Sequence, residues 1–199
     1  MGARLADRVL QAGQRGSTLT QQLLAYSSRQ MLKPVVIDAG QMLGEIESLA
    51  RASVGDAVSL HIASGPGIDR INADRAQLET ALLNLVINSR DALQTDDGTI
   101  IIRAKNTPLD EAAAAKLNLD AGRYVTIEVC DNGKGMEPDV LARAIEPFFT
   151  TKDVGQGPGL GLSMVHGFVK QSGGHLHIDS QPDVGTVVCV TLPAAIESD

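Results

Sequence analysis

Residues 78–93 of the chain read LETALLNLVINSRDAL, an aliphatic run that predicts a long helix over residues 75–94. Polar residues interrupt the run at steps of three, four, four and three, namely Gln77, Thr80, Asn84, Asn88 and Asp91. Residues at this spacing lie in one line along a helix. A buried polar group without a partner costs about 1–3 kcal/mol. The line therefore indicates either a bound polar ligand or an ordinary polar stripe on the surface.

Two members of this line are candidates for contact with a ligand. Asn84 and Asn88 are flanked by branched aliphatic residues. Amide oxygens suit Mg²⁺, which keeps several waters and takes further ligands from substrate phosphates. For Thr80, a hydrogen bond from its hydroxyl to the helix carbonyl four residues earlier is favoured. Glu79 and Arg90 fall off the line, and we expect both to face solvent.

Strand patterns lie on both sides of this helix. Alternation of apolar and polar residues predicts strands at 35–38, 58–62, 99–105 and 125–129, and two more around the turn at 181–185. Shorter helices are expected at 41–52, 138–144 and 162–171, and the Ala-rich stretch 107–121 indicates a loop or short helix. Because both hairpins and helices join these strands, an α+β two-layer sandwich is favoured over a doubly wound parallel sheet.

Residues 131–136, DNGKGM, directly follow a predicted strand. A carboxylate at a strand end can accept a hydrogen bond from an exocyclic amino group, and neighbouring glycines let a flat base approach the backbone. Asp and Gly are also common in plain turns, which is the alternative.

Residues 155–163, GQGPGLGLS, open a predicted helix. Glycine-rich backbone ahead of a helix N-terminus presents free N–H groups to anions such as phosphate. The segment matches neither GxxxxGK[ST] nor a G-x-G-x-x-G after a strand. A flexible loop without a ligand is the alternative.

The first part of the chain has a different pattern. Apolar or small residues recur at alternating steps of four and three, namely at Leu5, Val9, Ala12, Gly16, Leu19, Leu23 and Tyr26. This heptad seam predicts a bundle helix that lacks its partner. An amphipathic helix folded back on its own domain is the alternative. Pro34 ends the segment.

Composition excludes several classes of protein. The net charge is −7, the pI is near 5.0, and no cluster of Lys and Arg interrupts that balance, so nucleic acid is not expected as a partner. Cys130 and Cys189 lie on separate predicted strands and are expected to be reduced thiols. No apolar run reaches the length of a membrane span, and the first residues do not resemble a signal peptide. We therefore expect a cytoplasmic location.

In order and spacing, five segments resemble the asparagine, first-glycine, phenylalanine, second-glycine and third-glycine boxes of sensor histidine kinases. They are residues 78–93, 131–136, 146–152 (EPFFTTK), 155–163 and 185–186 (GT). Residues 4–33 resemble the second helix of that family's dimerisation hairpin. The resemblance thus implies a hairpin helix at 1–33, an ATP-binding kinase domain at 34–195 and a tail at 196–199. It also implies the Bergerat ATP-binding fold, an α+β arrangement with a mixed sheet of about five strands backed by three helices.

The resemblance implies ATP and Mg²⁺ as cofactors and suggests roles for individual residues. Asn88 would hold Mg²⁺ with Asn84 alongside, and Asp131 would receive the adenine amino group. Gly133 and Gly135 would line the base, and Thr186 would close the pocket near it. Lys152 would reach the phosphates as a point charge. Phosphate-binding backbone is expected in a mobile lid, residues 148–160, and just after it, at Gly157, Gly159, Leu160, Gly161 and Leu162.

Two residues depart from the family's pattern. Pro158 occupies a position that is usually Thr, so one N–H is missing from the lid. Asp91 stands where many members have Lys, a choice also seen in topoisomerase-type relatives. Arg90 and Lys134 are both candidates for supplying the missing charge, and the sequence does not choose between them.

The phosphoacceptor of the family is a His on the first hairpin helix, followed by an acidic residue. His61, His166, His175 and His177 all lie in the ATP-binding part and are followed by other residue types, so none is a candidate. His175 and His177 alternate on one predicted strand, which indicates exposed strand residues rather than a zinc pair.

The resemblance therefore implies transfer of the ATP γ-phosphate to a histidine outside this chain and then to a receiver-domain aspartate. The expected partners are the first hairpin helix, a receiver domain or response regulator, and a second copy in a homodimer of the full-length protein. A related Bergerat-fold ATP hydrolase is the second hypothesis. It is disfavoured because such enzymes place a Glu four residues before the metal Asn, where this chain has Asn84. A nucleotide-binding regulatory module without transfer activity is the third.

Overall fold

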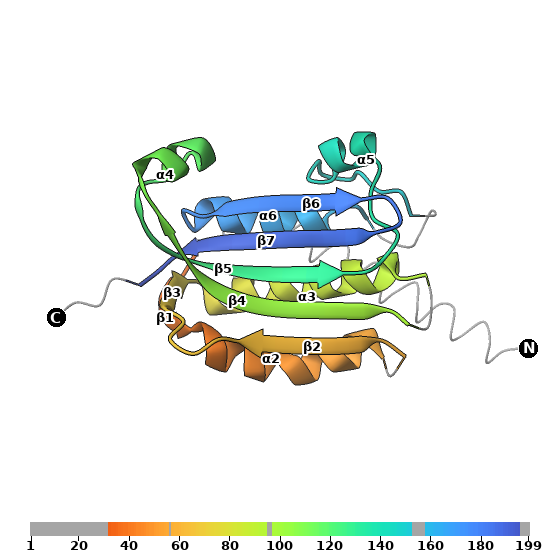
Figure 1. Cartoon of the computed structure of the whole chain (residues 1–199), viewed down its shortest axis with the longest axis horizontal. Coiled ribbons are helices and arrows are strands. Elements are labelled where there is room, and N and C mark those ends of the chain that lie inside the picture. The colour runs from red at the N-terminus through yellow and green to blue at the C-terminus, as the bar shows by residue number, and fades with distance from the viewer. Residues whose placement is uncertain (1–31, 56, 95–96, 153–157, 196–199) are drawn as a thin grey trace, which may run out of the picture.

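A computed structural model describes residues 32–55, 57–94, 97–152 and 158–195 of the protein (Figure 1). The hairpin helix predicted over 1–33 lies outside these residues except for its last two positions. Gly157 and the predicted tail at 196–199 also lie outside them.

The described residues form one large sheet and one small sheet. The large sheet has the strand order β2 (Ser59–Ser64), β4 (Thr99–Leu109), β5 (Gly122–Asp131), β7 (Gly185–Pro193) and β6 (His175–Gln181). Only β2 and β4 pair in parallel; the other neighbours are antiparallel. The small sheet pairs β1 (Val35–Asp38) with β3 (Arg70–Ala73) in antiparallel register.

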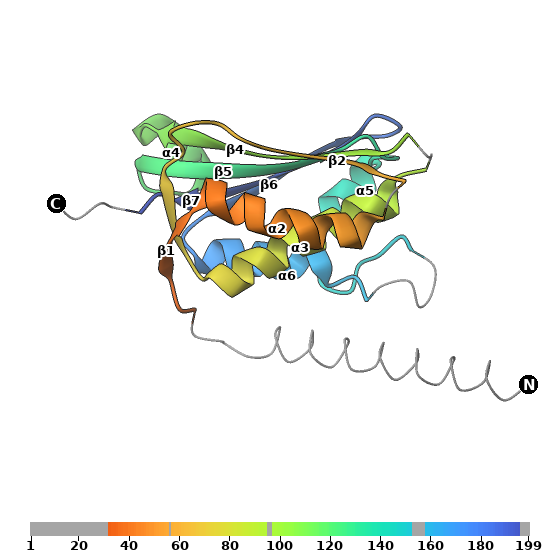
Figure 2. The same ribbon diagram turned by 90° about the horizontal axis from the view of Figure 1, so that it is seen from below.

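Three helices cover one face of the large sheet (Figure 2). They are α2 (Ala39–Val54), α3 (Arg75–Ala92) and α6 (Gly161–Gln171). The shorter α4 (Glu111–Leu117) connects β4 to β5, and α5 (Pro138–Arg143) follows β5. The predicted α+β architecture of a mixed five-stranded sheet backed by three helices is thereby confirmed.

The core lies between this sheet and its helices. Val125, Ile127 and Val129 alternate along β5 and are fully buried, as are Leu78 and Leu82 on α3. Each such side chain contributes about 1.5–3 kcal/mol through burial. The aliphatic side chains of residues 78–93 thus form part of the helical layer that packs against the sheet.

Aspartates at strand ends start two of the core helices. The Asp38 carboxylate accepts a hydrogen bond from the Gln41 N–H at 2.9 Å at the start of α2. Asp74 accepts from the Gln77 N–H at 3.1 Å at the start of α3. Such N-caps satisfy N–H groups that the helix itself leaves unpaired. They fix the point at which the chain turns from strand to helix.

The structure differs from the predicted elements in two places. β4 continues past residue 105 to Leu109, because it stays paired with β5 as far as Gly122. β2 ends opposite Ala104, so Pro108 lies on a free edge, where its missing N–H costs no sheet hydrogen bond. The short strand β3 was not predicted, since it has only four residues and lies close to the turn at Pro66 and Gly67. None of the described helices combines the length and apolar character that a membrane crossing requires.

Candidate functional site

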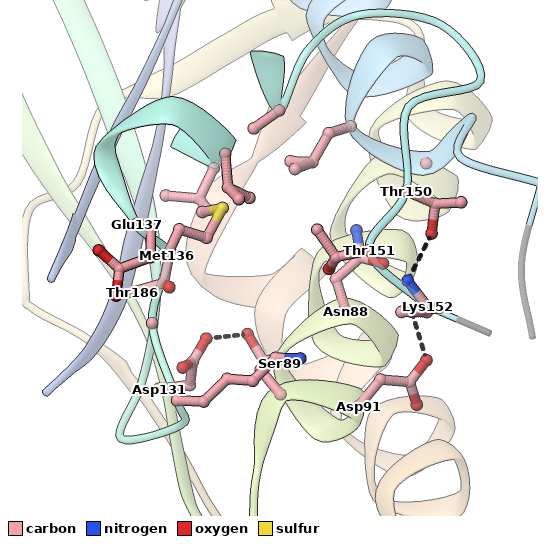
Figure 3. Close-up of a pocket in the computed structure, with 18 of the residues that line it drawn as sticks. Asn88, Ser89, Asp91, Asp131, Met136, Glu137, Thr150, Thr151, Lys152 and Thr186 are labelled. Carbon is pink, nitrogen blue, oxygen red and sulfur yellow. Dashed lines mark hydrogen bonds and ion pairs between the residues drawn. The ribbon is translucent and has the colours of Figure 1, made fainter. Parts of the chain in front are cut away.

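A cavity of about 480 Å³ opens between α3, the start of α6, the end of β5 and the segment that follows α5 (Figure 3). Its apolar wall includes Leu85, Met136, Val140 and Phe149. Two groups of its polar residues lie at opposite sides of the cavity. Asp131, Ser89 and Thr186 form one group, and Asn88, Asp91 and Lys152 form the other.

Asp131 is the last residue of β5 and carries the carboxylate of the first group. It accepts hydrogen bonds from the Ser89 hydroxyl at 2.8 Å and from the Gly133 N–H at 3.0 Å. A backbone hydrogen bond from Thr186 also reaches it. Burial nevertheless raises the pKa of the Asp131 carboxyl, and the three hydrogen bonds only partly oppose this. A carboxylate offers about four acceptor positions, so one remains for a donor in the cavity.

The turn after Asp131 depends on two glycines. Gly135 has a φ of +63°, and a methyl group there would lie 1.9 Å from the Gln181 carbonyl oxygen. Gly135 lines the cavity, as the prediction for a base-lining residue requires. A methyl group on Gly133 would lie 2.7 Å from the Ala92 carbonyl oxygen. Gly133 therefore packs against the end of α3 and is not among the residues that line the cavity.

Asn88 lies on α3 and faces the first turn of α6. A methyl group on Gly161 would lie 3.2 Å from Nδ2 of Asn88, so a side chain there would crowd the amide. The residue before α6, Leu160, provides no side-chain cap for the helix N-terminus. The partial positive charge of that terminus is thus directed toward the Asn88 side of the cavity.

Lys152 and Asp91 form an ion pair at the same side of the cavity, with 2.6 Å between Nζ and Oδ2. Arg90 also donates to Asp91, from Nε at 2.9 Å, and to the Ser53 carbonyl from Nη1 at 2.8 Å. Burial opposes the charge on Asp91, but the hydrogen bonds and attraction from Lys152 and Arg90 outweigh it and lower the pKa of this carboxyl. Arg90 was expected to face solvent, and 39% of its side chain is exposed, but the guanidinium also bridges α2 and α3.

The cavity brings together most of the predicted site residues, namely Asn88, Asp131, Gly135, Lys152, Gly159, Gly161, Leu162 and Thr186. Asn84 is half-buried one turn before Asn88 and does not line the cavity. Leu160 is fully buried and does not line the cavity. The predicted back-bond of Thr80 is confirmed, with 2.8 Å between its hydroxyl and the Ala76 carbonyl.

Ser89 and Phe149 are among the lining residues that were not predicted individually. Ser89 was not singled out, although it lies in the quoted run, because a serine in a helix carries no signal of its own. Phe149 forms part of the wall, and Arg143 stacks over its ring at 4.2 Å from the centroid. The Arg143–Phe149 spacing of six residues carries no periodic signal, so only the fold reveals the contact.

Comparison with known proteins shows which family the chain matches. Residues 73–196 match the family described as histidine kinase-, DNA gyrase B-, and HSP90-like ATPase. The chain is 43% identical over 192 residues to the sensor kinase CckA of Brucella abortus (strain 2308), covering 95% of this chain and 20% of CckA. It is 30% identical over 196 residues to the sensor protein FixL of Bradyrhizobium diazoefficiens, covering 98% of this chain and 35% of FixL. The chain thus spans about a fifth and a third of these two relatives.

Solved structures share the fold. Full-length ShkA in complex with AMPPNP matches with a TM-score of 0.77 and 21% identity, covering 98% of this chain and 40% of ShkA. The mycobacterial sensor histidine kinase MprB matches with a TM-score of 0.62 and 22% identity, covering 82% of this chain and 98% of MprB. These likenesses confirm the predicted Bergerat-type arrangement of sheet and helices.

Proposed function

Because the chain belongs to the family of histidine kinase-, DNA gyrase B-, and HSP90-like ATPases, we propose that its cavity binds ATP for transfer of the γ-phosphate to a histidine. The observation that carries this proposal is the separation of polar groups across one cavity. A half-buried carboxylate with a spare acceptor position lies at one side, and a lysine and an uncapped helix N-terminus lie at the other. ATP has the matching asymmetry, with an amino group on its base and anionic phosphates at its other end.

Adenine binds at the Asp131 side in this proposal. Its exocyclic amino group donates to the Asp131 carboxylate, and its flat ring packs against Met136 and Leu85. Charge-assisted hydrogen bonds of this kind are worth about 1.5–3 kcal/mol. Gly135 packs closely against Gln181 and carries no side chain of its own, which leaves room for a ring beside it.

Mg²⁺ fits the donor set at the phosphate side. The described residues contain no group of three or more His, Cys, Asp or Glu side chains that could hold a metal ion by themselves. An ion at Asn88 must therefore take most of its ligands from phosphates and water, which is the coordination that Mg²⁺ favours. When bound there, the ion would neutralise charge on the phosphates. Asn88 would supply one oxygen, and the first turn of α6 and Lys152 would supply donors to the remaining phosphate oxygens.

The receiving histidine belongs to a separate helix in this proposal. An acceptor must approach the γ-phosphate to about 3–3.5 Å, in line with the leaving oxygen. None of the four histidines of the chain precedes an acidic residue. The chain also spans only 20% of CckA, a protein named as a sensor kinase. A first hairpin helix, a receiver aspartate downstream and a cytoplasmic homodimer complete the proposed context.

ATP hydrolysis is the disfavoured alternative. The residue four positions before Asn88 is Asn84, which has no carboxylate and does not line the cavity. The protein therefore lacks at that position a base to orient an attacking water.

The proposed function is tested by adding a separate polypeptide that carries the His-bearing first hairpin helix. With radiolabelled ATP and Mg²⁺, we expect acid-labile phosphate on the added helix and none on this chain. Exchange of Leu19 and Leu23 for Asp should abolish this labelling while ATP still binds, since charge in the predicted heptad seam opposes helix pairing. Label on a histidine of the isolated chain would contradict the proposal.

A further inference from the structure

The charges that line the cavity raise a question about its phosphate side. Four lining residues are acidic, namely Asp91, Asp131, Glu137 and Asp183, and two are lysines, Lys134 and Lys152. An excess of acids opposes the binding of an anion unless each acid is kept apart from it or neutralised. Asp91 is the acid that most needs explanation. It lies three residues after Asn88 on α3, about 4.5 Å further along the helix axis and on nearly the same side.

Two cations neutralise Asp91, and they are held differently. Arg90 is anchored twice, to the Asp91 carboxylate and to the carbonyl of Ser53 on α2. Lys152 comes from the segment after α5, and its contact with Asp91 spans 61 positions of sequence. Its backbone N–H also donates to the Thr150 hydroxyl at 3.1 Å, which orients the segment (Figure 3). Two cations on one carboxylate leave the cluster with a net positive charge.

We propose that Asp91 is a positioning residue that holds the Lys152 ammonium beside Asn88, where it contacts the terminal phosphates of bound ATP. The inference rests on the proposed function and specifies one part of it. An ammonium has three N–H donors, so a single bond to Asp91 leaves two for phosphate oxygens. A lysine side chain loses much rotamer freedom when it is held in place. The ion pair with Asp91 holds the Lys152 side chain in place before ATP binds, so this loss of rotamer freedom does not oppose ATP binding.

This role explains how a carboxylate is compatible with a phosphate site. Arg90 keeps Asp91 neutralised while Lys152 turns toward the phosphates, so the acid does not repel them. The two cations outweigh the opposing effect of burial and keep Asp91 in its charged form, as its lowered pKa indicates. Only 29% of the Lys152 side chain and 24% of the Asp91 side chain is exposed, so solvent screens the pair less than it screens a surface ion pair.

A double-mutant cycle on the full chain tests the proposal. The affinities for Mg·ATP and Mg·ADP are measured by calorimetry for the wild type, Asp91→Asn, Lys152→Met and the double variant. We expect Lys152→Met to weaken ATP roughly 10-fold or more and ADP much less, since the ammonium acts on the terminal phosphate. Asp91→Asn should weaken ATP roughly 3- to 10-fold when Lys152 is present and have no further effect in the Lys152→Met background.

Two further variants control for other effects. Asp91→Glu keeps the carboxylate and should recover most of the ATP affinity. Glu79→Gln removes an equal charge from the same helix, at a residue that pairs with Arg75 away from the cavity, and should leave both affinities unchanged. Equal losses from Asp91→Asn in both backgrounds would overturn the proposal, because Asp91 would then not act through Lys152. Tighter ATP binding in Asp91→Asn would also overturn it, by showing that the ion pair withholds the lysine. If the wild type binds neither nucleotide, the proposed function itself is refuted, and the positioning role of Asp91 is refuted with it.

Discussion

The backbone N–H of Phe148 donates to the carbonyl of Gly159 at 2.9 Å, and both residues have left-handed backbone angles, with φ of +67° and +68°. One hydrogen bond thus joins the two ends of the predicted lid, next to Phe149 of the cavity wall. A bulky residue such as Phe seldom adopts a positive φ, which is found mostly where the surrounding structure imposes it at functional segments.

Gly159→Ala should therefore weaken ATP binding without unfolding the protein. A methyl group at this position would lie 2.6 Å from the Phe148 carbonyl carbon, and the left-handed angle costs a residue with Cβ about 1–2 kcal/mol. If relief of this strain breaks the hydrogen bond between Phe148 and residue 159, the affinity for ATP falls roughly 5- to 30-fold. Gly167→Ala is the matched control: it meets nothing within 4 Å on α6 and should raise the free energy of unfolding by about 0.5–1 kcal/mol. Unchanged ATP affinity in Gly159→Ala would show that the lid base is not coupled to the cavity.

Asp131→Asn should weaken ATP binding roughly 10- to 150-fold, because a charge-assisted hydrogen bond of about 1.5–3 kcal/mol is lost. Calorimetry with ATP and Mg²⁺ measures this directly. Asp139→Asn on α5 removes an exposed acid that does not line the cavity and should have no effect. Equal affinities for Asp131→Asn and the wild type would exclude adenine from this carboxylate.

ATP affinity should also fall as the pH is lowered through the pKa of Asp131, which burial raises above its ordinary value. The protonated carboxyl loses its charge, whereas a bound amino group favours the carboxylate, so binding in this range releases a proton. For the nucleotide-free protein the sign is opposite. Asp131 holds its proton more tightly when folded than when unfolded, so its contribution to stability is present at low pH and is lost as the pH rises through the folded pKa.

Affinity measured between about pH 4 and pH 7 checks this dependence. The phosphates of ATP titrate in part of the same range, and the curve of Asp131→Asn provides their contribution alone. Identical pH profiles for the variant and the wild type would contradict the assignment.

Asn88→Ala should remove most of the Mg²⁺ dependence of ATP binding and leave the fold intact, since the amide faces the cavity and not the core. Asn84→Ala provides the control, because Asn84 lies one turn away and does not line the cavity. We expect the Asn84 variant to keep the wild-type ratio of affinities with and without Mg²⁺. A wild type whose ATP affinity is the same with and without Mg²⁺ would refute the metal role of Asn88.

Local patterns determined much of this protein before any tertiary structure was known. The aliphatic run at 78–93 predicted α3, and period-two alternation predicted β2 and β5, because side-chain direction repeats with the backbone geometry of each element. Asn88 and Asp131 could be selected as site residues for a similar reason. Asn88 is a polar residue within an aliphatic helix pattern, and Asp131 is a polar residue at the end of a strand pattern.

Only the tertiary structure decided the contacts between distant segments. Lys152 pairs with Asp91 across 61 positions, and Ser89 reaches Asp131 across 42. Gly133, expected at the base, instead packs against Ala92, since its position depends on how β5 approaches the end of α3. Such pairs depend on which helix covers which strands, and no periodicity in the sequence encodes that choice. The sequence by itself thus determined the elements and the types of residue at the site, whereas packing of α3 and α6 against the sheet decided which of those residues meet.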